Sequence, residues 1–130
     1  MKARKRRHAG TSDTVLLRLW RQAVKARRGS LCAFCGDPGV AVEMHHIVGR
    51  RHALLRYDVR NGLPLCAACH RIAETLDGVD EIRAVIGDEE WGYLKERQRV
   101  LKKDWLVETG QSEADWRRGV KAALEGEAKR

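Results

Sequence analysis

Four cysteines form two Cys-x-x-Cys pairs, Cys32 with Cys35 and Cys66 with Cys69, and thirty residues separate the pairs. Thiolates in this pattern are the ligands of tetrahedral structural zinc. Because four thiolates leave no open coordination position, such a zinc ion would be architectural and would join the two ends of the thirty-residue insert. In a secreted protein the same cysteines could instead form two disulfides.

Three histidines accompany this framework. His45 and His46 are neighbours inside the insert, and His70 directly follows Cys69. A neutral imidazole, with a pKa near ~6.5, can take a proton from water at neutral pH, and imidazole nitrogen also binds divalent ions. Adjacent strand residues point to opposite faces, so one site that uses both His45 and His46 needs a bulge or a strand end. The alternatives are surface histidines or, for the pair, other zinc ligands.

The segment from Cys32 to His70 resembles the HNH endonucleases, whose fold is called ββα-metal or His-Me finger. The double Cys-x-x-Cys, the internal His45-His46-Ile47 and the closing Cys69-His70 carry this resemblance. It covers residues 30 to 76, and it implies an enzyme that hydrolyses phosphodiester bonds in DNA. It also implies that His45 and His70 bind a catalytic divalent ion and that His46 is the general base.

The resemblance assigns Asn61 to the role of orienting the base through the intervening loop. Asn61 is followed by glycine, however, and Asn-Gly is the commonest tight hairpin turn. Both interpretations remain open at this point. The stretch Arg56-Tyr57-Asp58, with Asn61 and the following Cys-x-x-Cys, also resembles a phage recombination nuclease group of the NinG or Rap type, although His70 stands where that group has asparagine.

In the HNH family, aspartate is common where this chain has His45. Nitrogen ligands favour transition ions over Mg²⁺. The expected cofactors are therefore structural Zn²⁺ and one catalytic ion, which is Mn²⁺, Mg²⁺, Co²⁺ or Ni²⁺. Resemblance and size further predict a phage or prophage protein acting in DNA recombination, processing or packaging. The rival function is a non-catalytic zinc module that binds DNA or protein, which would need the cysteines but not the histidines.

The positive charge is concentrated at the N-terminus. Residues 1–28 carry a net charge of +9, which exceeds the +8 of the whole chain because residues 71–130 carry −2. A basic arm beside a metal site favours a polyanionic partner, and we expect DNA; a solvated tail is the alternative. The predicted DNA-binding residues are basic side chains of the tail and of the loop after the histidine pair, namely Lys2, Arg4, Lys5, Arg6, Arg7, Arg50, Arg51, Arg56 and Arg60. For any one of the loop arginines, a solvated side chain is nearly as good an interpretation.

No secretory signal or membrane span is visible, because Arg18 interrupts the apolar Val15-Leu16-Leu17. We therefore expect no membrane partner, and a cytoplasmic location in a bacterial host cell. The other expected partner is a phage packaging or recombination protein.

The predicted fold is α+β and mostly helical, with an HNH ββα-metal module and flanking helices at both ends. Residues 1–10 form a basic disordered tail, 11–29 an amphipathic basic helix, 30–78 the nuclease module and 79–130 a helical extension. Within the module we expect a strand over 40–47, an extended run over 63–65, and a helix from 67 that stops at Asp77-Gly78. In the extension, apolar residues at helical spacing predict one helix that contains Trp91 and Trp105, and Ser112 to Asp115 resembles a capping box.

Overall fold

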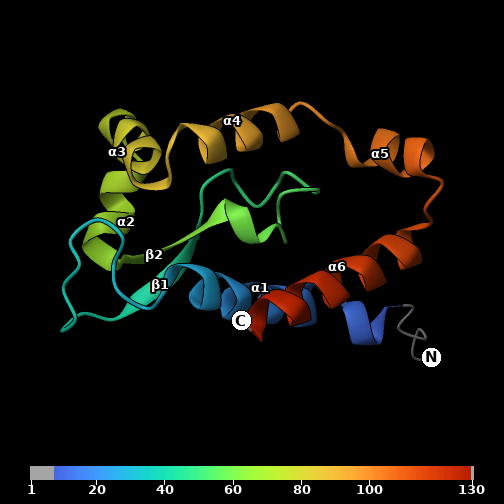
Figure 1. The fold of residues 1–130 in the computed structure, drawn as a ribbon, viewed down its shortest axis with the longest axis horizontal. Coiled ribbons are helices and arrows are strands. Elements are labelled where there is room, and N and C mark those ends of the chain that lie inside the picture. The colour runs from blue at the N-terminus through green and yellow to red at the C-terminus, as the bar shows by residue number, and fades with distance from the viewer. Residues whose placement is uncertain (1–7, 130) are drawn as a thin grey trace, which may run out of the picture.

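The structure is a computed structural model and describes residues 8–129. Six α-helices, two strands and two short 3₁₀ helices make up this part of the chain. Figure 1 shows the helices arranged around a central loop and a two-stranded hairpin. In chain order the elements are η1 (Ala9–Thr11), α1 (Asp13–Arg28), β1 (Val42–His46), η2 (Val59–Asn61), β2 (Gly62–Cys66), α2 (Ala67–Ala73), α3 (Leu76–Ile86), α4 (Asp88–Arg97), α5 (Lys102–Thr109) and α6 (Glu113–Ala128).

Strand, strand and helix follow one another in the centre, so the predicted ββα order is confirmed and the fold is mostly helical. Strand β1 pairs with β2 in an antiparallel ladder that runs without a bulge from Val42 opposite Cys66 to His46 opposite Gly62. Every residue of β2 is buried. Residues 47–61 connect the strands as a long loop, and Gly62 has an extended conformation with φ −138°. The Asn61-Gly62 pair is therefore not a tight hairpin turn.

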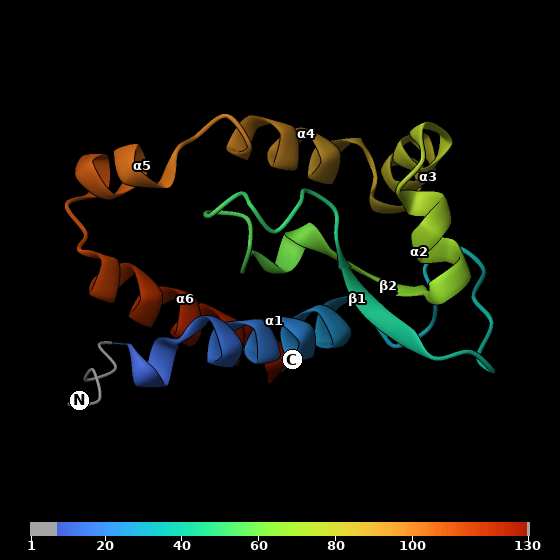
Figure 2. The same ribbon diagram turned by 180° about the vertical axis from the view of Figure 1, so that it is seen from behind.

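Helix α1 begins at Asp13, where the Ser12 side chain caps it by accepting a hydrogen bond from the Val15 N–H. Its apolar face, which includes Leu16, Trp20 and Val24, is buried. Helix α6 lies along α1 in both views (Figures 1 and 2) and contributes Trp116 and Leu124 to the same core. The C-terminal helices thus act as a scaffold for α1.

The capping box before α6 is confirmed, because Ser112 and Asp115 bond reciprocally. A second group of contacts comes from α4, which covers the long loop. Leu94 of α4 packs on Val48 and Leu55 of that loop.

The predicted end of the first module helix at Asp77-Gly78 is wrong. Helix α2 already ends at Ala73, and Thr75 caps a new helix by accepting from the Gly78 N–H. A Cβ at Gly78 would lie 2.0 Å from the Ile72 carbonyl oxygen. Glycine serves here to let α3 fold closely back on α2, and not to stop a helix.

The single helix predicted to contain Trp91 and Trp105 is also wrong, since α4 and α5 are separate helices joined by residues 98–101. Trp91 packs against the cluster around the cysteines, whereas Val100 and Trp105 pack against the core between α1 and α6. The chain bends between the two tryptophans to serve both clusters, so tertiary packing overrides the helical periodicity.

Among residues 8–129, none of the helices has both the length and the apolar character needed to cross a bilayer. The predicted tail cations, from Lys2 to Arg7, lie outside the described residues.

Two helical glycines give a matched test of the packing between α2 and α3. Gly78→Ala should lower the free energy of unfolding by about 1–3 kcal/mol, because the new methyl group overlaps the backbone of α2. Gly92→Ala in α4 should raise it by about 0.5–1 kcal/mol, because nothing lies within 4 Å of its added Cβ. Urea unfolding of both variants measures the two signs. Stabilisation by both substitutions would contradict the close approach at Gly78.

Candidate functional site

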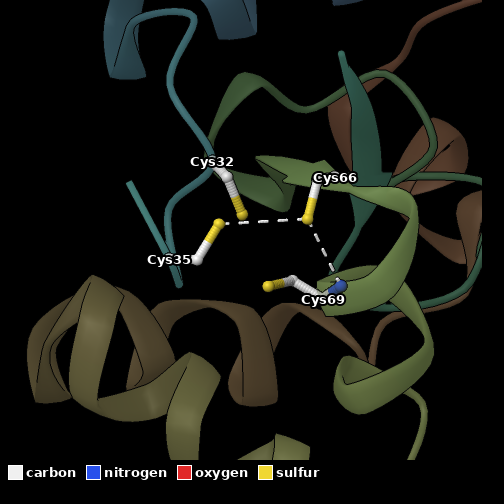
Figure 3. A group of neighbouring side chains, drawn as sticks. All are labelled: Cys32, Cys35, Cys66 and Cys69. Carbon is white, nitrogen blue, oxygen red and sulfur yellow. Dashed lines mark hydrogen bonds between the residues drawn. The ribbon is translucent and has the colours of Figure 1, made fainter. Parts of the chain in front are cut away.

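The two Cys-x-x-Cys pairs come together at one end of the hairpin (Figure 3). Cys32 and Cys35 form a knuckle in which the Gly36 N–H donates to the Cys32 carbonyl, and Gly36 adopts a left-handed φ of 66°. The Ala33 N–H donates to the Pro64 carbonyl of β2 and so fixes the knuckle against the hairpin. Cys66 ends β2 and caps α2, which places Cys69 one turn further along that helix.

The four sulfur atoms fit one zinc ion. All four lie within 4.8 Å of one another, and the Cys35 and Cys66 sulfurs are 4.0 Å apart. A tetrahedral site with zinc–sulfur distances of about 2.3 Å needs sulfurs about 3.8 Å apart. Burial raises the pKa of the Cys69 thiol to about 12. Zinc loading would therefore have to displace thiol protons. The four cysteines can thus hold the structural zinc expected from the sequence.

His45 and His46 end strand β1, and both line the same groove. The ladder has no bulge, so the strand end, and not a bulge, is what lets these neighbours serve one site. His46 lies opposite Gly62 in the ladder. A Cβ on Gly62 would lie 2.8 Å from Trp20 of α1, so the glycine allows that indole to lie against the hairpin.

The His46 ring is held on two sides. It stacks on the Trp20 indole with centroids 3.8 Å apart and an interplanar angle of 7°. Its Nε2 is 2.8 Å from the Arg56 carbonyl oxygen, which can only accept, so in the neutral ring the proton is on Nε2. Nδ1 is then the nitrogen with a free lone pair. Burial lowers the pKa of His46, and nearby arginines act in the same direction, so the neutral, basic form is favoured.

Asn61 is fully buried and ties the long loop together. Its Oδ1 accepts from the Val48 N–H at 2.7 Å, and its Nδ2 donates to the carbonyls of Val48 and Leu55, each at 2.9 Å. Leu55 directly precedes Arg56, whose carbonyl meets His46. The contacts fit the predicted role, in which Asn61 acts on His46 through the loop.

His45 and His70 face each other across the strand–helix junction. Their ring centroids are 4.6 Å apart with an interplanar angle of 64°. One turn after His70, a Glu74 carboxylate oxygen lies 3.3 Å from His70 Nε2. Burial and the neighbouring His70 lower the pKa of His45 to about 4, which favours the neutral ring, in which one nitrogen has a lone pair free for a cation. Two imidazoles and a carboxylate are suitable donors for a divalent transition ion.

His45, His46 and His70 line one groove of about 730 Å³. Its walls are α1, with Trp20, Arg21 and Lys25, and β1 with the start of the long loop, including Arg50; His70 also lines it. Of the four loop arginines predicted to bind DNA, Arg50 alone appears among the described residues that line the groove.

The other three loop arginines lie elsewhere. Arg56 donates to the Arg50 carbonyl and pairs with Asp13, Arg60 stacks over the Tyr93 ring, and Arg51 is exposed. Their predicted contact with DNA stays a prediction.

Sequence reasoning missed two kinds of residue at this site. Glu74 could have been found from its position four residues after His70 on a helix, since such residues are neighbours. Trp20, Arg21 and Lys25 could be assigned to helical faces but not to the groove, because no local pattern tells which way α1 packs on the hairpin.

The zinc centre makes a direct prediction. The purified chain should contain one zinc per molecule, and Cys69→Ser should lose the metal and unfold, because structural zinc contributes on the order of 10 kcal/mol to folding in small domains. Metal analysis and circular dichroism measure both effects. His45→Ala is the matched control and should keep one zinc; loss of zinc from this variant would place a histidine among the ligands.

Comparison with known proteins agrees with this geometry over one segment. No curated protein and no solved structure matches the chain. The family model described as HNH endonuclease matches residues 32–75, a segment that contains all four cysteines, the three groove histidines, Asn61 and Glu74. Over residues 32–75 the chain therefore matches the HNH endonuclease family.

Proposed function

We propose that this protein is a metal-dependent endonuclease that hydrolyses phosphodiester bonds in DNA. One observation carries the proposal: His45, His46 and His70 line a single groove, apart from the four-cysteine cluster. A module that used zinc for architecture alone would have no need for three imidazoles in a basic groove. The family match over residues 32–75 supports a nuclease-type function.

In this proposal His46 is the general base. Its Nδ1 takes a proton from the water that attacks the scissile phosphorus, while Nε2 keeps its hydrogen bond to the Arg56 carbonyl. The bond from phosphorus to the 3′ oxygen breaks, leaving 5′-phosphate and 3′-hydroxyl ends. Trp20 and the loop held by Asn61 keep the ring in one orientation, which lowers the cost of reaching the reactive geometry.

His45 and His70 would hold the catalytic divalent ion, and Glu74 would add an oxygen ligand. A bound ion at this position would neutralise charge on the scissile phosphate and the leaving 3′ oxygen. The closeness of the two rings and of Glu74 to His70 supports this ligand set. A phage or prophage origin, action on DNA in a bacterial cytoplasm and a phage packaging or recombination partner belong to the same proposal; the sequence resemblance alone supports them.

Removal of the base is the central test. His46→Ala should slow cleavage of plasmid DNA by roughly 10²–10⁴-fold, since that is the contribution of a general base. Zinc content and far-UV circular dichroism should stay at parent values. His8→Ala, which removes a histidine outside the groove, is the control and should cleave like the parent. Equal rates for the His46 variant and the parent would exclude His46 from the reaction.

The ligand set predicts the ion preference. Mn²⁺, Co²⁺ or Ni²⁺ should support cleavage at lower concentration than Mg²⁺, because imidazole suits transition ions better. His45→Asp should shift the preference toward Mg²⁺. Calorimetric titration of Mn²⁺ into zinc-loaded parent and variant gives a readout independent of cleavage. The same ion ranking in both proteins would show that His45 is not a ligand.

A further inference from the structure

We propose that Arg21 and Lys25 of α1 bind backbone phosphates of the DNA strand next to the bond that is cut. This inference rests on the proposed function, and it assigns substrate binding to a helix outside the family segment. The ligand is the sugar–phosphate backbone, so the contact would be independent of base sequence.

The first support is the position of the two cations. Arg21 and Lys25 of α1 line the same groove as His45, His46 and His70. They are four residues apart on one helix, so they lie on one face with Cβ atoms roughly 5–6 Å apart. Both are exposed, so neither has to lose buried contacts to meet a ligand.

The second support is that this wall is rigidly placed relative to the proposed base. Trp20, which directly precedes Arg21, stacks on His46, and its Nε1 donates to the Asp58 carbonyl at 2.8 Å. At the far end of the helix, Arg28 Nε donates to the Gly62 carbonyl of β2 at 2.7 Å. Cations held between these two anchors keep a fixed distance from the reacting centre, which is what positioning of a flanking phosphate requires.

Apart from Arg18, which does not line the groove, the cations of α1 divide into two groups. Arg27 and Arg28 both contact the Glu90 carboxylate, and Arg28 also bonds backbone carbonyls. Within residues 8–129, neither Arg21 nor Lys25 has an ion pair or a side-chain hydrogen bond. The helix therefore uses its last two arginines for structure and leaves two cations directed to the groove free for an anion.

The groove has an uneven charge. Arg50 adds a third cation from the long loop, and Glu43 of β1 is the one carboxylate among the described residues that line it. Three cations against one carboxylate make the groove attractive to a polyanion, while Glu43 would repel any phosphate that approached its part of β1. The favoured path for a strand lies along α1.

The test measures DNA binding without cleavage. Zinc-loaded full-length protein carrying His46→Ala is titrated into a fluorescent duplex of random sequence, without other divalent ions, at a series of NaCl concentrations. In this background, Arg21→Ala/Lys25→Ala should lower the slope of log K against log salt by about 2, since each phosphate contact contributes about 0.9. Glu43→Gln should have the opposite effect on affinity and tighten binding.

The chain offers a matched control in Arg99 and Lys103, which have the same residue types and the same four-residue spacing. Both are exposed and lie outside the groove. Arg99→Ala/Lys103→Ala removes the same charge, and it should leave the slope within experimental error of the parent. Equal slopes for the two double variants would overturn the inference, because only general charge would then matter.

Cleavage by proteins with an intact His46 separates the two proposals. If the parent does not cut DNA but the α1 variant loses slope, the nuclease proposal fails and the phosphate contacts stand. If the α1 variant cuts with an unchanged KM and binds with an unchanged slope, the contacts fail and the nuclease stands. If both hold, the α1 variant should show a raised KM with kcat changed much less.

Discussion

A single buried side-chain amide holds together the long loop that connects the two strands. Asn61, the last residue of the long loop, bonds Val48 near its start and Leu55 in its middle, and no part of its side chain reaches solvent. A buried amide that lost these partners would cost about 1–3 kcal/mol for each unsatisfied group, so the loop has one strongly preferred arrangement. That arrangement determines where the Arg56 carbonyl meets the His46 ring and where Arg50 enters the groove.

The loop is also fixed from outside by groups far away in the sequence. Tyr93 of α4 donates its hydroxyl to Asp58, and Tyr57 donates to Asp13 at the start of α1. Asp58 uses its carbonyl for the Trp20 indole as well. Helices α1 and α4 therefore do more than cover a core, because they fix a loop that has little regular structure of its own.

Sequence reasoning could predict the parts whose signals are local. The Cys-x-x-Cys spacing, the capping box at Ser112 and the ββα order follow from short patterns, and the structure contains all of them. It failed where distant packing decides. Gly78 resembles a helix stop, yet close approach of two helices explains it, and the regular spacing from Trp91 to Trp105 gives no sign of the bend between them. The faces of α1 were predictable, but the surface on which one of them packs, the hairpin at Gly62, was not.

Gly62 also limits how far the family segment can be regarded as a unit. The segment from 32 to 75 contains the four cysteines and the three groove histidines, yet the indole that supports the His46 ring comes from residue 20, and it fits only because residue 62 has no side chain. The glycine inside the segment and the tryptophan outside it pack directly against each other. If the segment were moved into another protein, it would keep its cysteines and histidines but lose the indole on which the His46 ring stacks. The support of the His46 ring therefore depends on residues both inside and outside the segment, and a larger side chain at position 62 would collide with the indole of Trp20.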